Sequence, residues 1–197
     1  MRKLLVSFAA LAVLVVAVPS FAQPATWKID SAHSASQFAV KHLVISTVRG
    51  QFGKTTGAVQ FDGQDYKTIA VDATIDVASI DTREEGRDKH LRSADFFDAE
   101  KFPTITFKSK RVDGVSGSKF KLVGDLTMRG VTKEVTLDVE ATPVIKGTRG
   151  ESRIGAHATG RINRQDFGVN WSRTMDAGGL VVANEVDMVI DLELIKQ

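Results

Sequence analysis

The histidine and arginine residues of this chain are the ones whose side chains could bind a metal ion or an anionic group. His33 and His42 lie nine positions apart, and an odd spacing within one continuous strand places two side chains on opposite faces. Neither belongs to a His-x-His or His-x₃-His pair, the close spacing that favours a metal site, although Asp30 is near His33. We therefore expect no metal site, and we expect both histidines to form hydrogen bonds at the mouth of the fold.

A second group of charged side chains surrounds His90. Its basic members are Arg83, Arg87, Lys89 and Arg92. Such a cluster can hold an anionic head group through charge-assisted hydrogen bonds. Three carboxylates among them dilute the charge, so most members are expected to form a solvated helix face. Arg87 and Arg92 are the two that merit testing. His157 lies mid-strand, and we expect it to face the solvent.

Several catalytic classes lack their motifs. The chain has no Cys, which excludes disulfides, thiolate metal sites and a cysteine nucleophile. It has no Gly-x-Ser-x-Gly elbow, phosphate loop or dinucleotide fingerprint. A Ser-His-Asp triad is left open, because such triads assemble in space rather than in sequence. We name no catalytic residue.

The first 22 residues have the features of a secretory signal peptide. Arg2 and Lys3 precede an uncharged apolar run from Leu4 to Val18, which is too short to span a bilayer, and Ser20-Phe21-Ala22 supplies a small-x-small end. Cleavage after Ala22 leaves 175 residues with 24 basic and 24 acidic side chains. We expect a single domain, residues 23–197, in the periplasm, and a near-neutral chain argues against nucleic-acid binding.

Alternation of apolar and polar residues dominates the mature chain. In Glu185–Ile195, every second residue from Val186 to Leu194 is apolar, the pattern of a strand with one dry face. Similar runs occur near residues 38–42, 59–61, 69–77, 105–107, 122–128, 135–141 and 154–162. Asp62-Gly63, Asp113-Gly114 and Arg129-Gly130 favour hairpin turns. About eight antiparallel strands joined by short turns predict an all-β barrel or sandwich.

One insertion interrupts this pattern between Asp81 and Pro103. Thr82 and Glu85 match a capping box, which predicts a helix followed by a loop that could cover one end of a barrel. Small residues on the predicted inner face, such as Ala156, Ala158 and Gly160, leave room for a ligand. Large partners such as Phe107 or Met188 could equally fill that room, so a hollow and a packed barrel both remain open.

The motifs together resemble the YceI-like family of polyisoprenoid-binding periplasmic proteins, and the matches run along nearly all of the mature chain. The N-terminal half contributes residues 27–30, 33–34, 38–42, 50–52, 57–62, 80–82, 87–92, 95–98 and 102–107. The C-terminal half contributes residues 124–133, 164–168 and 185–186. The resemblance implies an eight-stranded antiparallel lipocalin-like β-barrel with one short helix or loop insertion. It also implies an apolar tunnel for an isoprenoid or another long-chain amphiphile. Some relatives are homodimers, and several are associated with stress or with lipid and quinone metabolism.

The resemblance assigns roles to the matched residues. Candidates for the tunnel wall are Phe38, Val40, Phe52, Val59, Phe61, Ile75, Phe107, Leu122, Leu126, Ile162 and Phe167. Candidates for a polar end that holds a head group are His33, His42, Arg87, His90 and Arg164. A salt bridge between Arg164 and Asp166 or another carboxylate is an equally good alternative for that arginine.

A non-enzymatic carrier of a polyprenyl lipid, isoprenoid quinone or fatty-acid-like lipid is our first hypothesis. It requires no cofactor, and a homodimer is compatible with it. A lipid-modifying enzyme that uses a histidine at the barrel mouth as its base is the second. A packed barrel that serves as an interaction protein for a membrane redox partner is the third.

Overall fold

The structure, a computed structural model, describes residues 24–175 and 178–197. The predicted signal peptide, residues 1–22, lies outside the described residues and stays a prediction. In the described part of the chain the strands are β1 (Ala25–Ile29), β2 (Ala35–His42), β3 (Ser46–Phe52), β4 (Thr55–Phe61), β5 (Ala70–Asp76), β6 (Ile80–Asp81), β7 (Thr104–Ser116), β8 (Lys119–Met128), β9 (Val131–Ala141), β10 (Ile145–Lys146), β11 (Ser152–Asn163) and β12 (Val182–Lys196). The helical segments are the α-helix α1 (Glu85–Arg92) and the 3-10 helices η1 (Tyr66–Thr68), η2 (Val77–Ser79) and η3 (Arg164–Phe167).

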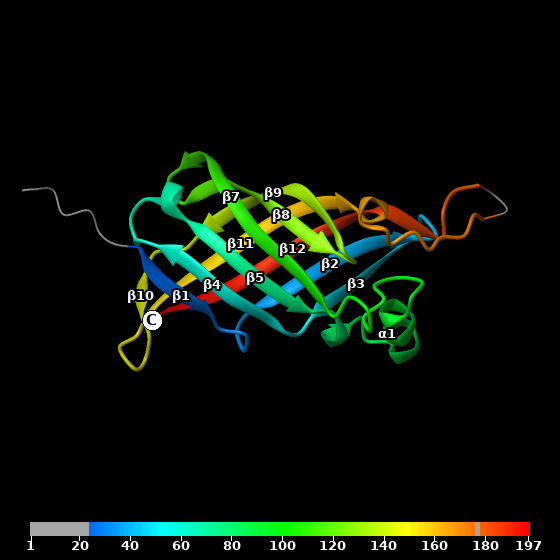
Figure 1. The fold of residues 1–197 in the computed structure, drawn as a ribbon, viewed down its shortest axis with the longest axis horizontal. Helices are drawn as coiled ribbons and strands as arrows, with labels where there is room; N and C mark the ends of the chain where they lie inside the picture. Colours follow the sequence, from blue (N-terminus) through cyan, green and yellow to red (C-terminus); the bar gives the residue numbers. More distant parts are fainter. Residues whose placement is uncertain (1–23, 176–177) are drawn as a thin grey trace, which may run out of the picture.

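Eight of these strands close into an antiparallel barrel. They run in the order β11-β9-β8-β7-β5-β4-β1-β12, and β12 pairs back onto β11 along residues 185–195 (Figure 1). The predicted eight-stranded antiparallel barrel with one short helix is therefore confirmed. Closure gives each of these eight strands a paired neighbour on both sides, so none of them is an edge strand over its whole length.

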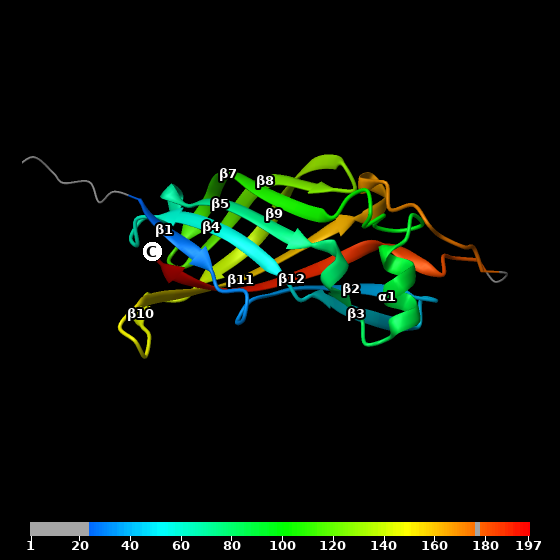
Figure 2. The ribbon, with the colours of Figure 1, turned by 60° about the horizontal axis from the view of Figure 1, so that its bottom comes forward.

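At one end of the barrel, the strands β2, β3 and β6 extend the sheet beyond β12. β1 and β2 follow one another along the same edge of β12, with Ile29 opposite Leu194 and Ala35 opposite Asp191. β3 pairs with β2, and β6 pairs with β3. α1 follows β6 at this end and lies beside β2 and β3 (Figure 2).

The apolar faces of the strands meet inside the barrel, as the alternation predicts. Leu194 on β12 and Ile154 on β11 are paired and buried in one cluster, together with Trp27. A second cluster, towards α1, contains Ile105, Ile162 and other large side chains. Charged residues between the apolar positions face outward and pair across strands, as Arg161 does with Asp187.

Two local predictions fail and one is met. Arg129 and Gly130 both have positive φ, 51° and 74°, as the two central residues of a tight hairpin require. Asp113-Gly114 is no hairpin turn, because both residues lie within β7, where the register shifts, and the chain turns later, between β7 and β8. The capping box is also wrong. The helix begins at Glu85, so Glu84 is the N-cap, and its carboxylate accepts hydrogen bonds from the Gly86 and Arg87 amides. Thr82 Oγ1 donates to buried Asp88 instead.

Candidate functional site: an apolar cavity in the barrel

A cavity of about 230 Å³ lies inside the barrel. Its wall comes from the inner faces of the strands and from the segment that follows α1, which contributes Phe96 and Phe97. Almost all of the wall is aliphatic or aromatic. An apolar cavity of roughly 150 Å³ is enough to bind benzene, so this space suits an apolar group larger than one ring.

Ten of the eleven side chains proposed for a tunnel wall line this cavity. They are Phe38, Val40, Phe52, Val59, Phe61, Ile75, Phe107, Leu122, Leu126 and Ile162. Phe167 is not among the lining residues. It follows β11 in η3, and its ring is buried in the second core cluster beside Val169. Phe167 therefore supports the wall from behind.

The small residues of the inner face divide into two kinds. A Cβ atom at Gly124 would lie 2.5 Å from Phe107 Cζ, and one at Gly160 would lie 2.7 Å from Leu137 Cδ2. Those two glycines make room for neighbouring side chains. Ala156 and Ala158 line the cavity itself. The barrel is thus partly packed and partly hollow, and the hollow lies beside the alanines of β11.

Two hydroxyl groups interrupt the apolar wall. Ser36 on β2 and Thr55 on β4 are buried, line the cavity, and share a hydrogen bond of 2.9 Å between Ser36 Oγ and Thr55 Oγ1. Because one hydroxyl donates and the other accepts, both oxygen atoms have a hydrogen-bond partner in these apolar surroundings without a ligand.

Aromatic side chains close both ends of the cavity. At one end, Tyr66 of η1 stacks between Phe61 and Phe120, with ring centroids 5.3 Å from each. At the α1 end, the ring of Phe96 lies 5.1 Å from that of Trp171. These rings add aromatic surface at both ends of the cavity, and Phe61, Phe96 and Phe120 also line it.

The segment that closes the α1 end is held by arginines. Arg92 donates to the Ala78 and Ile80 carbonyls, at 3.0 and 3.1 Å. Arg129, from the β8–β9 turn, donates to the Ala94 carbonyl at 2.9 Å and to the Phe96 carbonyl. Arg87, a proposed head-group ligand, donates to Thr82 Oγ1 and to the Thr82 carbonyl, at 2.7 and 2.8 Å. Arg92 thus ties the segment to residues 78–80, whereas Arg87 bonds within the segment itself.

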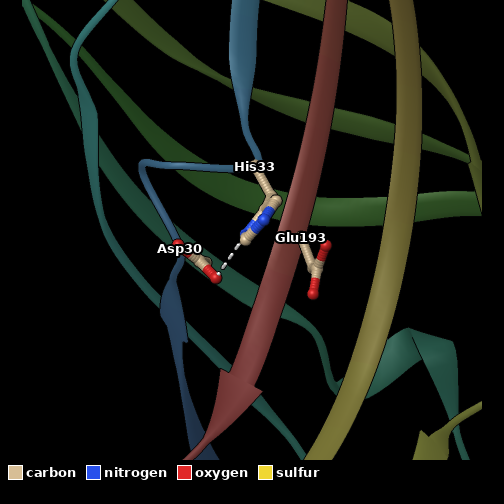
Figure 3. A group of neighbouring side chains, drawn as sticks. All are labelled: Asp30, His33 and Glu193. Atoms are coloured by element: carbon tan, nitrogen blue, oxygen red, sulfur yellow. Dashed lines mark hydrogen bonds and ion pairs between the residues drawn. The ribbon is translucent and has the colours of Figure 1, made fainter. Parts of the chain in front are cut away.

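His33 lies in an ion-pair network on the outside of the barrel. His33 Nδ1 and Asp30 Oδ2 share a hydrogen bond of 2.9 Å, and Glu193 of β12 lies next to them (Figure 3). Arg153 of β11 donates to both carboxylates and to Glu151. Glu193 is eleven residues along β12 from Val182. Val182 pairs with His42 and accepts a hydrogen bond from Arg164, so the structure does not bring His33 together with these two candidates.

This network is also the arrangement of described residues that most resembles a metal site. One ligand atom each from Asp30, His33 and Glu193 lies within 4.8 Å of the others. Arg153 already pairs with both carboxylates, so a metal ion would have to displace its guanidinium. The hydrogen bond with Asp30 raises the pKa of His33, and the same bond, together with Arg153, lowers the pKa of Asp30. These shifts are those of a salt-bridge network.

His42 and His90 lie at the α1 end. His42 is opposite Val182, the first residue of β12. His90 Nε2 is 2.9 Å from Asp95 Oδ2, and its ring packs edge-on against Phe96 and Trp171. None of the four histidines, all of which are described, lines the cavity.

Arg164 is the polar candidate that reaches the cavity wall. Its side chain is 5% exposed, and it donates to the Val169 and Trp171 carbonyls at 2.6 and 2.8 Å and to the Ala183 carbonyl at 2.9 Å. Longer contacts reach Val182 O and Asn184 Oδ1. It makes no salt bridge with any described carboxylate, so the alternative with Asp166 is wrong. Burial lowers the pKa of Arg164. Through its carbonyl partners, Arg164 connects the segment that follows η3 to the start of β12.

Sequence reasoning predicted that the insertion could cover one end of the barrel but did not name the side chains that it contributes to the cavity wall. Leu91, Phe96 and Phe97 line the cavity. The sequence did carry a sign of this contribution, because Phe96 and Phe97, which lie between Asp95 and Asp98 in a polar loop, need an apolar surface to pack against. The Ser36–Thr55 pair carried no comparable signal, since isolated hydroxyl residues are common on both faces of strands.

Comparisons with known proteins agree with this architecture. The sequence profile of the YceI-like domain matches residues 27–194. A UPF0312 protein of Staphylococcus aureus (strain MSSA476) is 42% identical over 158 residues, which cover 80% of this chain and 90% of that protein. A crystal structure of the Campylobacter jejuni YCEI protein superposes with a TM-score of 0.70 at 34% identity, covering 80% of this chain and 90% of that one.

A more distant structure shares the fold. It is a polyisoprenoid binding domain from Saccharophagus degradans implicated in plant cell wall breakdown, with a TM-score of 0.65 at 14% identity, covering 87% of this chain and 98% of that one. Across the described residues, no helix has the length and apolar character needed to cross a bilayer.

Proposed function

This chain belongs to the YceI-like family, and from that premise we propose that it is a non-enzymatic periplasmic carrier of an isoprenoid or another long-chain amphiphile. The observation that supports this proposal is the closed barrel whose interior cavity is lined almost wholly by apolar side chains. The isoprenoid assignment draws on the polyisoprenoid binding domain with the same fold. The periplasmic location draws on the signal-peptide pattern in residues 1–22.

Burial of a hydrocarbon tail supplies the binding energy. Apolar surface removed from water contributes roughly 25 cal/mol per Å², so several hundred Å² of a long chain gives a gross driving force on the order of 10 kcal/mol. Ligand pockets commonly measure about 300–1,000 Å³. A cavity of about 230 Å³ is smaller, so a long chain has to move wall side chains as it enters.

The cap formed by residues 81–103 is the part of the wall most suited to such movement. It lines the cavity with Phe96 and Phe97, packs against the core through these rings, and receives hydrogen bonds from Arg129 to two of its carbonyl groups, which can break and re-form. We propose that ligand exchange requires displacement of this cap. The barrel strands each have a paired neighbour on both sides, although β9 pairs with β11 only at Asp138–Ala141 and β4 pairs with β1 only at Ala58–Phe61.

A substitution that fills the cavity tests the carrier proposal. Ala156 lines the cavity on β11, and Ala156→Phe is expected to weaken binding of a fluorescent fatty acid or polyprenol by about tenfold or more. His157→Phe, on the outer face of the same strand, is the matched control and should leave binding unchanged. Equal binding by both variants would overturn the assignment of the cavity as the ligand site.

A further inference from the structure

The tip of the hairpin between β2 and β3 exposes large apolar side chains. Val44 is 69% exposed and Ile45 is 84% exposed. The other exposed pair among the described large hydrophobic residues is Val144 and Ile145, at 43% and 60%. Ile145 begins β10, which lies at the opposite end of the barrel (Figure 1). Adjacent exposed aliphatic residues at a projecting tip are typical of an interaction site.

The backbone of the tip is unfavourable for the residues it carries. Leu43 and Val44 have φ values of 52° and 64°. Two positive φ values in succession suit Asn-Gly, whereas a β-branched valine meets steric hindrance in that conformation. Other residues would stabilise this hairpin better, which points to a role for these apolar side chains in binding rather than in stability.

Basic side chains flank the tip. Lys41 and Arg49 are exposed and share the outer face of the hairpin, and Arg173 is exposed in the loop whose Val181 accepts a hydrogen bond from the Leu43 amide. Residues 41–49, 171–175 and 178–184, all described, hold these three basic side chains and no carboxylate. Asp176 lies outside the described residues.

We propose that this tip docks onto an anionic phospholipid bilayer. Val44 and Ile45 enter the interfacial layer, and Lys41, Arg49 and Arg173 pair with lipid phosphates. Apolar side chains combined with basic ones are the recognised means of attaching a soluble protein to an anionic membrane. The tip adjoins the end of the cavity that Val40 and Val182 line, so docking brings that end to the lipid surface. The proposal concerns a surface and does not depend on what the cavity binds.

Vesicle binding by the mature protein tests the proposal. We expect sedimentation with vesicles of phosphatidylglycerol and phosphatidylcholine, at least about tenfold weaker binding to phosphatidylcholine alone, and loss of binding at high salt. The double variant Val44→Asn, Ile45→Ser should lose about tenfold or more of this binding. Asparagine tolerates positive φ, so the hairpin should persist, and an unchanged melting temperature would check this.

The exposed pair at the other end of the barrel provides the matched control. Val144→Ser with Ile145→Ser removes a similar apolar surface, and binding should be unchanged. Absence of binding by the unaltered protein, or an equal loss in the two double variants, would overturn the proposal. Self-association that the Val44 and Ile45 substitutions abolish, without vesicle binding, would overturn it in favour of a dimer contact.

A site-specific label gives an independent measurement. The chain has no native Cys, so Ile45→Cys and Ile145→Cys can each carry a single polarity-sensitive dye. Anionic vesicles should shift the emission of the dye at position 45 to the blue and leave that at position 145 unchanged. A shift at neither position, or at both, would contradict docking through this tip.

Discussion

The ring of Phe107 on β7 lies directly over Gly124 on β8, so a Cβ atom at position 124 would come within 2.5 Å of Phe107 Cζ and 2.6 Å of the Lys108 carbonyl oxygen. The ring can turn away but the backbone carbonyl cannot. Gly124→Ala is therefore expected to lower the free energy of unfolding by about 1–3 kcal/mol, measured by chemical denaturation. Gly53→Ala is the control, because its nearest new contact is at 3.8 Å. Equal stability of the two variants would contradict this packing.

Arg164 should be necessary for stability because of its carbonyl partners. Arg164→Met leaves buried carbonyl groups, including those of Val169 and Trp171, without their donor, and should cost about 3 kcal/mol or more in denaturation experiments. Arg161→Met, which removes an exposed ion pair with Asp187, should cost under about 1 kcal/mol. A small effect at position 164 would show that its carbonyl partners find water instead.

The His33 network makes stability depend on pH in two ranges. The raised pKa of His33 means that its contribution is fully present below the usual value of 6.5 and is lost as the pH rises through the higher pKa of the folded state. The lowered pKa of Asp30 means that its contribution is present above the usual 3.8 and is lost as the pH falls through the lower pKa of the folded state. NMR titration of His33 should give a pKa above 6.5, and Asp30→Asn should lower it. A His33 pKa that Asp30→Asn leaves unchanged would contradict the assigned cause.

Release of the cap should accelerate ligand exchange. Arg129→Asn removes both hydrogen bonds to the cap while creating an Asn-Gly pair that suits the β8–β9 hairpin. Loading of a fluorescent lipid, followed by stopped flow, should become roughly tenfold faster or more, since hydrogen bonds from a charged donor contribute about 1.5–3 kcal/mol each.

A tethered cap is the complementary test. A disulfide between the cap and the barrel rim should slow lipid loading, and reduction should restore it. Unchanged loading in both the Arg129→Asn and the tethered variants would exclude displacement of the cap as the route.

The barrel could be predicted from the sequence because its strands bury one face each. The alternation in β12 sets which residues point inward, and Leu194 and Ile154 lie in the core as that pattern requires. Arg129-Gly130 forms the predicted turn, because a two-residue connection between β8 and β9 requires positive φ at both positions. Asp113-Gly114 has the same local preference, yet pairing between β7 and β8 continues beyond it, with Ser116 opposite Lys119. At Asp113-Gly114, pairing between the two long strands therefore overrides the local preference for a turn.

The polar end was harder to predict than the apolar wall. Period-two alternation places Phe38 and Val40 on the cavity side. A polar residue near a turn, however, can bond in any direction. Arg164 bonds to carbonyls, Arg87 to Thr82, and His33 joins a network with Arg153, which is distant in sequence. The first two sets of partners are local and follow the path of a loop, whereas Arg153 reaches Asp30 only because the fold brings β11 beside the N-terminal segment.

Native mass spectrometry of the mature protein, purified without detergent, tests the central claim most directly. We expect a discrete additional mass that corresponds to one amphiphile per chain, that organic extraction removes, and that Ala156→Phe prevents. Identification of that mass would define the ligand class. A bare protein mass, unchanged after incubation with isoprenoid quinones, polyprenyl phosphates and fatty acids, would contradict lipid carriage and direct attention to a protein partner.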